Sequence, residues 1–303
     1  MSDAKNADTP SQGDAAIQQQ QQQQQQQPPD ADELWHLSLN DSQPDTVVLL
    51  HGLGSSHFEW ELVWPHLSAY HLLVPDLPGH SSSAALSPCT IPAQAERVAA
   101  LIRRRAHGGV AHLVGLSMGG FVAVETARAH PSLMRSVFGS GCGPFAGWRM
   151  WAARYPGVLV ALQAAHGMLP VWLADWVNDA AWRAQGLTVP DGARREIRRN
   201  ARGALVREVF GSITLVKLDA LRAVSVRALA VTGGKMEDVE ATRRLGAALK
   251  AGCAESRAAI VREAVHPWNL QFPELFARGI CAWIEGEPLP DEFEDLPETP
   301  PAE

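Results

Sequence analysis

Cysteine is scarce in this chain of 303 residues, and its few cysteines stand far apart. The four are Cys89, Cys142, Cys253 and Cys281, and no two of them form a Cys-x-x-Cys pair. This spacing excludes the disulfide framework of a small secreted domain, and it offers no cysteine-based zinc site. It is typical of a reducing compartment, so we expect a cytoplasmic protein.

Long apolar runs and phosphate-binding glycine loops are also missing. No apolar stretch reaches the roughly 18 residues that a membrane-spanning helix needs, and the N-terminus lacks the apolar core of a signal peptide. The glycine-rich residues 115–120 have neither the Lys-Ser/Thr ending of a P-loop nor the spacing of a dinucleotide fingerprint. No stretch has the spacing of metal ligands. The sequence therefore predicts no membrane span, no cofactor and no metal.

Negative charge is concentrated at the two ends of the chain. Residues 1–34 carry a net charge of −5 and residues 285–303 one of −8, within a total of −7, so the remainder carries +6. That balance is too small to indicate nucleic acid binding. Residues 18–27 are ten consecutive glutamines, and residues 285–303 hold eight acidic residues and five prolines. Both compositions are typical of disorder, so we predict tails over 1–33 and 285–303.

One serine stands between glycines directly after a strand-like run. The apolar residues 110–114 precede Gly115-Leu116-Ser117-Met118-Gly119, and a helical pattern follows to residue 130. Strand, Gly-x-Ser-x-Gly and helix in this order are typical of a nucleophile on a sharp, strained turn. A Cβ two residues before or after the serine would clash there, so both positions need glycine. We predict that Ser117 is a nucleophile; a structural serine in a glycine-rich turn is the alternative.

A second glycine loop stands upstream and offers oxyanion donors. Residues 47–50 predict a buried strand, and His51-Gly52-Leu53-Gly54 follows it. Acyl transfer needs backbone N–H groups aimed at the developing negative charge. The amides of Leu53 and Met118 are the candidates, and a plain turn at the end of a strand is the alternative. We interpret His51 as a structural histidine.

A histidine and two acids follow the serine. His266 lies in a predicted loop between a strand at 258–261 and the last helix, where a neutral imidazole could take the serine proton and return it. Glu237 and Asp238 follow a predicted strand at 226–232, and either carboxylate could orient the histidine. The sequence does not choose between them. Both could instead be solvated acids at the start of the helix predicted over 241–251.

Four ordered stretches resemble the α/β-hydrolase superfamily, in its small-cap group of serine esterases, lipases, lactonases and C–C hydrolases. The resemblance covers about residues 35–284, with serine, acid and histidine in the family's chain order. Its motifs are His51-Gly52-Leu53-Gly54, Asp76-Leu77-Pro78-Gly79-His80-Ser81, Gly115-Leu116-Ser117-Met118-Gly119-Gly120, and the segment from His266 to Phe276. We interpret Asp76 and His80 as residues that hold a turn. The family's acid position is Met236 when counted from Gly233, and Glu237 when counted from Gly234.

Strand and helix patterns alternate along the chain, except between residues 143 and 216. The alternation predicts an α/β fold with a mostly parallel sheet covered by helices on both faces, in a core of residues 34–142 and 217–284. Residues 143–216 are helical in pattern and predict a cap inserted over the serine. The cap holds five of the ten tryptophans, which could line an apolar pocket or pack the cap onto the core: Trp148, Trp151, Trp172, Trp176 and Trp182.

These observations favour a serine hydrolase that cleaves a carboxylic ester or a related carbonyl substrate through an acyl-enzyme. Ser117 would attack, His266 would act as base and then as acid, and Glu237 or Asp238 would orient His266. The same groups could instead hydrolyse a lactone or a C–C bond. A second alternative is a weakly catalytic or non-catalytic small-molecule receptor with this fold. In each case the expected partner is a small, apolar molecule.

Overall fold

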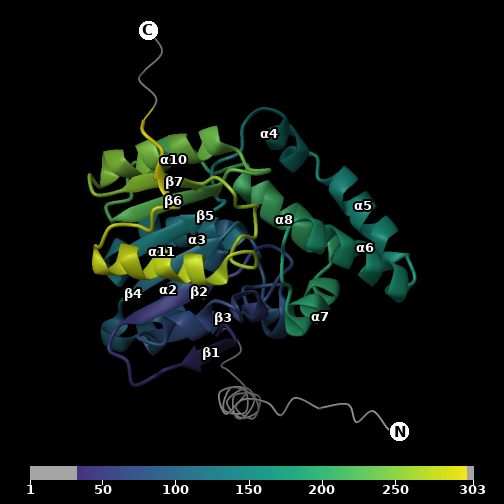
Figure 1. Ribbon diagram of the computed structural model, residues 1–303, viewed down its shortest axis with the longest axis horizontal. Coiled ribbons are helices and arrows are strands. Elements are labelled where there is room, and N and C mark those ends of the chain that lie inside the picture. The colour runs from purple at the N-terminus through teal and green to yellow at the C-terminus, as the bar shows by residue number, and fades with distance from the viewer. Residues whose placement is uncertain (1–32, 299–303) are drawn as a thin grey trace, which may run out of the picture.

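An eight-stranded sheet forms the centre of the computed structural model, which describes residues 33–298 (Figure 1). The order across the sheet is β1-β3-β2-β4-β5-β6-β7-β8. The strands are β1 (His36–Leu39), β2 (Thr46–Leu50), β3 (His71–Pro75), β4 (Ala111–Leu116), β5 (Met134–Ser140), β6 (Ala228–Gly233), β7 (Arg257–Val261) and β8 (Glu294–Asp295). Strands β2 to β7 run parallel, whereas β1 and β8 pair antiparallel at the two edges. The predicted α/β class and mostly parallel sheet are confirmed.

The central strands are buried on both faces, which explains their continuous apolar sequences. In β2, Val47 and Leu49 belong to one apolar core, whereas Val48 and Leu50 belong to the other. One core is closed by α11 (Pro273–Glu285) and the short 3-10 helices η1 (His57–Trp60) and η2 (Trp64–Leu67). The other is closed by α2 (Ile91–Arg105), α3 (Met118–Ala129) and α10 (Val239–Gly252). The remaining short helices are η3 (Ser81–Ser83), η4 (His107–Gly109), η5 (Pro131–Leu133) and α9 (Leu218–Leu221).

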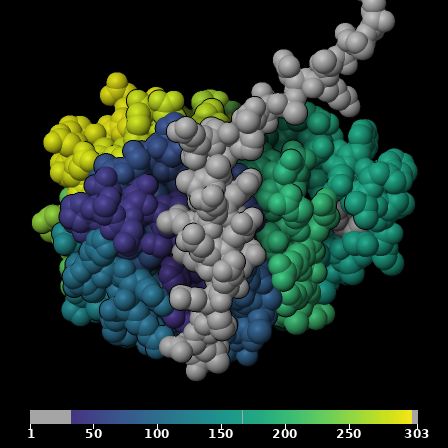
Figure 2. Space-filling model, turned by 90° about the horizontal axis from the view of Figure 1, so that it is seen from below, coloured from purple at the N-terminus to yellow at the C-terminus, as the bar shows by residue number. Residues whose placement is uncertain are grey.

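Five helices are inserted between β5 and α9, within the stretch where the sequence predicts a cap. They are α4 (Gly147–Arg154), α5 (Gly157–Gly167), α6 (Val171–Ala184), α7 (Asp191–Arg199) and α8 (Gly203–Ile213). Figure 1 shows α8 beside the sheet, with α5 and α6 on its outer side, and Figure 2 shows the insertion in green and teal at one side of the molecule. Leu205 and Val209 of α8 are buried in the core beneath, so α8 anchors the insertion. In residues 33–298, no helix is long and apolar enough to cross a lipid bilayer.

Most tryptophans of the insertion neither line the pocket nor pack the insertion onto the core. Trp148, Trp151, Trp172 and Trp176 are each more than 60% exposed. Only Trp182 is partly buried, in a small cluster beside the core. None of the five lines the pocket at Ser117. The prediction that they line a pocket or pack the cap onto the core is therefore wrong for four of them, because α8, which carries no tryptophan, makes the packing contact.

The C-terminal segment also differs from the expected tail. Gly286 ends α11 in a left-handed conformation, and the chain turns back along the sheet, where β8 pairs with β7. Phe293 anchors this segment, because its ring is 8% exposed and packs on Trp268 and Phe138. The acids beside it pair with basic residues: Glu292 with Arg278, Glu294 with Arg262, and Asp295 with Arg257. Residues 286–298 are thus part of the folded domain, and residues 299–303 lie outside the described chain.

The N-terminal prediction falls almost wholly outside the described residues, which begin at Glu33. Glu33, the last residue of the predicted tail, is buried and forms an ion pair with Arg105 of α2, with its Oε1 2.8 Å from Nε. The last residue of the predicted tail is therefore part of the described fold.

Candidate active site

Ser117 stands between β4 and α3 in a backbone conformation that residues with a side chain rarely adopt. Its φ is 54° and its ψ is −117°. Such strain costs on the order of 1–3 kcal/mol and persists only where the surrounding structure enforces it. The Ser117 N–H donates to the carbonyl oxygen of Ser140 at 2.7 Å, which ties the turn to β5. The turn places Ser117 at the carboxyl edge of the parallel strands, in the wall of a pocket.

Glycines on either side of Ser117 are required by neighbouring backbone. A Cβ on Gly115 would lie 2.2 Å from the carbonyl oxygen of Gly119, and a Cβ on Gly119 would lie 2.1 Å from that of Leu50. Both distances are far shorter than van der Waals contact. The reason that the sequence suggests for glycine two residues before and two after the serine is confirmed.

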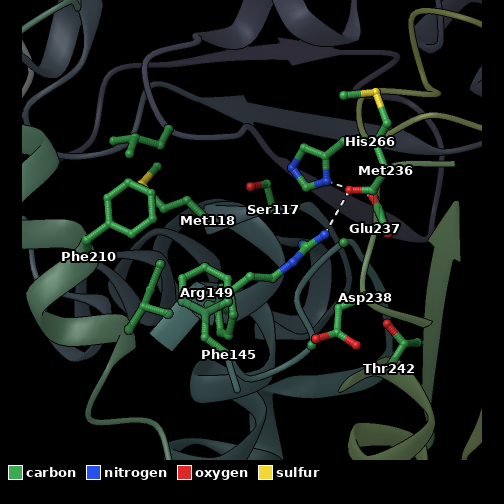
Figure 3. Close-up of a pocket in the computed structure, with 15 residues that line it drawn as sticks. Ser117, Met118, Phe145, Arg149, Phe210, Met236, Glu237, Asp238, Thr242 and His266 are labelled. Carbon is green, nitrogen blue, oxygen red and sulfur yellow. Dashed lines mark hydrogen bonds and ion pairs between the residues drawn. The ribbon is translucent and has the colours of Figure 1, made fainter. Parts of the chain in front are cut away.

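His266 and Glu237 form a short hydrogen bond in the wall of the same pocket (Figure 3). Nδ1 of His266 lies 2.6 Å from Oε1 of Glu237. Oε2 of Glu237 accepts from the Thr232 hydroxyl at 2.5 Å and from the Gly233 N–H at 3.0 Å. These three donors orient the carboxylate. Because it can only accept, Nδ1 carries the proton, and Nε2 of the neutral ring is free to accept one.

Asp238 has a different partner. Its carboxylate accepts from the Ala241 N–H at 3.0 Å and caps the N-terminus of α10. Figure 3 shows Asp238 apart from His266, beside Thr242. Of the two acids that the sequence leaves open, the structure brings only Glu237 to His266. Met236 has a φ of 66° and is 73% exposed, and the turn at this residue separates Glu237 from β6.

The environment of His266 favours its charged form. Burial, the largest single influence on the pKa of His266, acts to lower it, because burial disfavours a charged ring. The hydrogen bond that His266 donates to Glu237, the charge of Glu237 and the charge of Glu59 act in the opposite direction. Together they raise the pKa of His266 above its ordinary value. A proton taken up by the ring is therefore held more firmly than on a histidine in water.

The two predicted oxyanion donors lie in the same pocket wall as Ser117. Met118 is the first residue of α3, where backbone N–H groups have no partner inside the helix. Leu53 follows β2 in the loop that also contains Gly52. Within residues 33–298, neither amide has a hydrogen-bond acceptor, and the Ser117 hydroxyl has no hydrogen bond to His266. Such bonds commonly tighten only when substrate binds.

Three residues of the motifs hold loops in place, as the sequence suggests. His51 Nε2 accepts from the Leu77 N–H at 2.9 Å, and His80 Nε2 accepts from the Gly54 N–H at 3.0 Å. Asp76, which is fully buried, accepts from both the main chain and the ring of His57 at 2.9 Å. These bonds join the loop after β2 to the loop after β3, and they fix the position of the Leu53 amide.

Glu59, which no sequence motif singles out, is a buried acid that contacts the loop after β2. Its Oε2 accepts from the Gly52 N–H at 2.6 Å, one residue before Leu53. Burial raises the pKa of Glu59 to about 7, although the bond from Gly52 acts to lower it. An acid between the aromatic residues Phe58 and Trp60 is the signal that could have revealed it.

Gly141 is a second residue that the sequence did not single out. It follows β5 with a φ of 62°, and a Cβ there would lie 2.6 Å from Cε1 of His266 and 3.0 Å from Oε1 of Glu237. The backbone of Gly141 therefore packs directly against the His266–Glu237 pair and leaves no room for a side chain at this position. The signal in the sequence is a glycine directly after a predicted strand.

The pocket is small and largely apolar. It encloses about 240 Å³ between the sheet and the insertion. Phe210 and Met118 lie on the other side of Ser117 from His266 (Figure 3). Arg149 of α4 is the one basic side chain among the lining residues other than His266, and its guanidinium donates to the Met236 carbonyl oxygen at 3.0 Å. The apolar lining residues are Leu53, Met118, Phe121, Phe145, Phe210, Ile213 and Met236.

Comparison with known proteins gives one family. The model of the alpha/beta hydrolase family matches residues 47–279. The chain is 33% identical over 259 residues to an AB hydrolase superfamily protein of Gibberella zeae, with 84% of each chain covered. It is 29% identical over 261 residues to a pimeloyl-[acyl-carrier protein] methyl ester esterase of Neisseria meningitidis, covering 81% of this chain and 96% of that one.

Solved structures share the fold at lower identity. A thermophilic esterase of Thermogutta terrifontis superposes with a TM-score of 0.62 at 20% identity, covering 80% of this chain and 90% of that one. MenH of S. aureus superposes with a TM-score of 0.62 at 17% identity, covering 80% of this chain and 94% of that one. The solved structures share the fold, and the family match over residues 47–279 together with the 33% identical relative shows that the chain belongs to the α/β-hydrolase family.

Proposed function

We propose that this protein is a serine hydrolase that cleaves carboxylic esters through an acyl-enzyme, with Ser117, His266 and Glu237 as its catalytic residues. One observation carries the proposal. The strained turn presents Ser117 in the same pocket wall as a histidine whose Nδ1 is bonded to a buried carboxylate. A serine hydroxyl is a weak nucleophile until a positioned base removes its proton.

The first half of the reaction forms the acyl-enzyme. Oγ of Ser117 attacks the ester carbonyl carbon while Nε2 of His266 takes the hydroxyl proton. The Leu53 and Met118 amides donate to the oxygen that becomes negative. The tetrahedral intermediate then expels the alcohol, and the His266 imidazolium protonates it. Glu237 holds Nδ1–H throughout and stabilises the charged ring.

Water completes the cycle. Nε2 of His266 removes a proton from water as the water oxygen attacks the acyl carbon. The second tetrahedral intermediate expels Oγ of Ser117, which regains its proton from His266, and the carboxylic acid leaves. Every proton is passed through one nitrogen atom, so the reaction needs no cofactor.

Relatives support ester hydrolysis in particular. The Neisseria relative is a methyl ester esterase and the Thermogutta structure is that of an esterase. The apolar lining of the pocket favours a small apolar acyl or alcohol group. Because the insertion contributes Phe145, Arg149, Phe210 and Ile213 to that lining, we propose that it acts as a cap that sets the choice of substrate.

Release of p-nitrophenol from acetate, butyrate and octanoate esters tests the proposal. We expect turnover by the wild type and at least a thousandfold loss in Ser117→Ala. Ser132→Ala is a matched control, because Ser132 is an exposed serine at the opposite end of the strands, and it should retain full activity. Turnover by Ser117→Ala at the rate of the wild type would contradict the proposal. So would a wild type that neither hydrolyses these esters nor reacts with a fluorophosphonate.

A further inference from the structure

Three successive helices of the insertion expose large apolar side chains to solvent. Each has a residue that points inward: Ala153 of α4 and Ala174 of α6 are buried, and Val160 of α5 lies against Gly203, the first residue of α8. An α-helix turns by about 100° per residue, so residues two positions before and after an inward residue lie on the opposite side. Those six residues, here called the outer apolar face, are each more than 60% exposed: Trp151, Tyr155, Val158, Leu162, Trp172 and Trp176.

The outer apolar face points away from the core. Helices α4 and α5 pack on α8, and α8 packs on α2 of the core. Figure 1 shows α5 and α6 on the outer side of α8, with α4 at one end. The exposed sides of the three helices therefore belong to the outside of the insertion. Large exposed apolar patches are uncommon on soluble proteins, and they mark surfaces that bind something.

Acidic side chains are kept away from this surface. Residues 143–174, which include α4 and α5, contain no aspartate or glutamate. The two acids of α6 form ion pairs with α7, Asp175 with Arg198 and Asp179 with Arg194. Their charges are therefore compensated within the insertion.

Two arginines add positive charge to the outer side of the helices. Arg154 lies three residues after Trp151 in α4, and Arg183 lies seven residues after Trp176 in α6. These spacings place each arginine on the same side of its helix as the tryptophan, and both arginines are exposed. Aromatic side chains and positive charge thus share one surface.

This combination suits an anionic lipid bilayer better than a second copy of the chain. In a two-fold dimer the same surface meets itself, so Arg154 and Arg183 would face their own counterparts without an acid between residues 143 and 174 to offset them. Tryptophan and tyrosine are favoured at the headgroup level of a bilayer, where one end of the ring is apolar and the other is wet. Basic residues beside them attract anionic lipids.

We propose that the outer apolar face, with Arg154 and Arg183, docks the protein on the surface of anionic lipid bilayers. The aromatic rings enter the headgroup region, and the arginines contact the lipid phosphates. The protein lies on the bilayer through this surface. Helix α4 also supplies Arg149 to the lining of the pocket at Ser117, so docking brings the pocket to the bilayer.

Cosedimentation of the full chain with large unilamellar vesicles tests the proposal. The wild type should bind vesicles of equal parts phosphatidylcholine and phosphatidylglycerol, and should bind phosphatidylcholine alone at least tenfold more weakly. The double variant Trp172→Gln/Trp176→Gln should bind the anionic vesicles at least tenfold more weakly than the wild type.

Charge is tested by single arginine variants on the same anionic vesicles. Arg154→Gln and Arg183→Gln should each weaken binding about fivefold. Arg278→Gln is the matched control, because Arg278 is 54% exposed on α11, outside the insertion. It should bind as the wild type does. The Tm of each variant should equal that of the wild type, since all the substituted side chains are exposed.

The result does not depend on the reaction at Ser117. Ser117→Ala should bind vesicles as the wild type does, so failure of the proposed hydrolysis would leave this test intact. Absence of wild-type binding to anionic vesicles would overturn the proposal, as would equal binding by Trp172→Gln/Trp176→Gln or equal binding to phosphatidylcholine alone. A wild-type dimer in analytical ultracentrifugation that the double variant dissociates would assign the face to a second copy and would also overturn it.

Discussion

At the scale of single residues, the chemistry depends on which of two adjacent acids holds His266. Glu237 reaches Nδ1 of His266 because Oε2 of the same carboxylate is held by Thr232 and Gly233 at the end of β6. Asp238, one residue later, accepts from the Ala241 N–H at the start of α10. Adjacent residues in a turn point in different directions, so only the conformation of the turn decides between them. This is why the sequence leaves the choice open.

Substitution of each acid by its amide separates the two roles. Glu237→Gln should lower kcat at least a hundredfold, since the ring loses the charge that stabilises its imidazolium form. Asp238→Asn should leave kcat within threefold of the wild type, because asparagine caps a helix about as well as aspartate. Steady-state kinetics on a p-nitrophenyl ester measure both. A larger loss in Asp238→Asn than in Glu237→Gln would show that the acid is misassigned.

The buried acid Glu59 predicts a dependence of stability on pH. Its pKa in the folded protein is about 7, raised by burial from an ordinary value of 4.5. Between these values the folded protein holds a proton that the unfolded chain releases, so this residue makes the free energy of unfolding fall as pH rises from 4.5 to 7. The stabilising contribution of Glu59 is therefore fully present below pH 4.5 and is lost above pH 7.

Glu59→Gln removes this contribution but keeps an oxygen that can accept from Gly52. The free energy of unfolding of Glu59→Gln should therefore fall less between pH 5 and pH 8 than that of the wild type. His266 adds a decline of the same sign, because its raised pKa stabilises the folded state only while the ring is charged. The charge of Glu59 is one cause of that raised pKa, so the difference between the two proteins measures Glu59 together with its effect on His266. Urea denaturation at the two pH values measures it, and parallel declines would show that Glu59 is ionised throughout.

At the scale of elements, the carboxyl ends of four parallel strands assemble the site. Ser117 follows β4, Gly141 follows β5, Glu237 comes after β6 and His266 comes after β7. The strands and the loop after each were predictable, because buried parallel strands have continuous apolar sequences. The exposure of the four tryptophans on the outer face of the insertion was not predictable. A tryptophan favours burial in general, but whether it is buried here depends on which helix of the insertion packs on the core, and α8 does so against α2.

Gly141→Ala tests how closely β5 approaches the histidine–glutamate pair. A methyl group there would collide with Cε1 of His266, and φ would be strained, so we expect kcat to fall at least tenfold. Gly108→Ala is the matched control, with a φ of 66° and no atom within 4 Å of the added Cβ. It should lose stability but keep its activity. Equal activity in Gly141→Ala and Gly108→Ala would contradict the close approach.

At the scale of the whole molecule, the core and the insertion each supply part of the pocket. The core supplies Ser117, His266 and Glu237, and the insertion supplies Phe145, Arg149 and other lining residues. The core could be predicted because its motifs are local. The insertion's lining could not, since Phe145 and Phe210 are 65 positions apart and meet only in the folded chain. Phe293 was missed for a related reason, because one aromatic residue in an acidic segment has no periodic pattern.

The identity of the nucleophile is tested most directly by reaction with a fluorophosphonate, with the modified residue located by peptide mass spectrometry. We predict one label per chain, on Ser117, with no labelling of Ser117→Ala. The rate of labelling should fall at least tenfold in Glu237→Gln, because His266 then activates Ser117 less well. Absence of labelling in the wild type, or a label on any other residue, would contradict the assignment of Ser117 as the nucleophile.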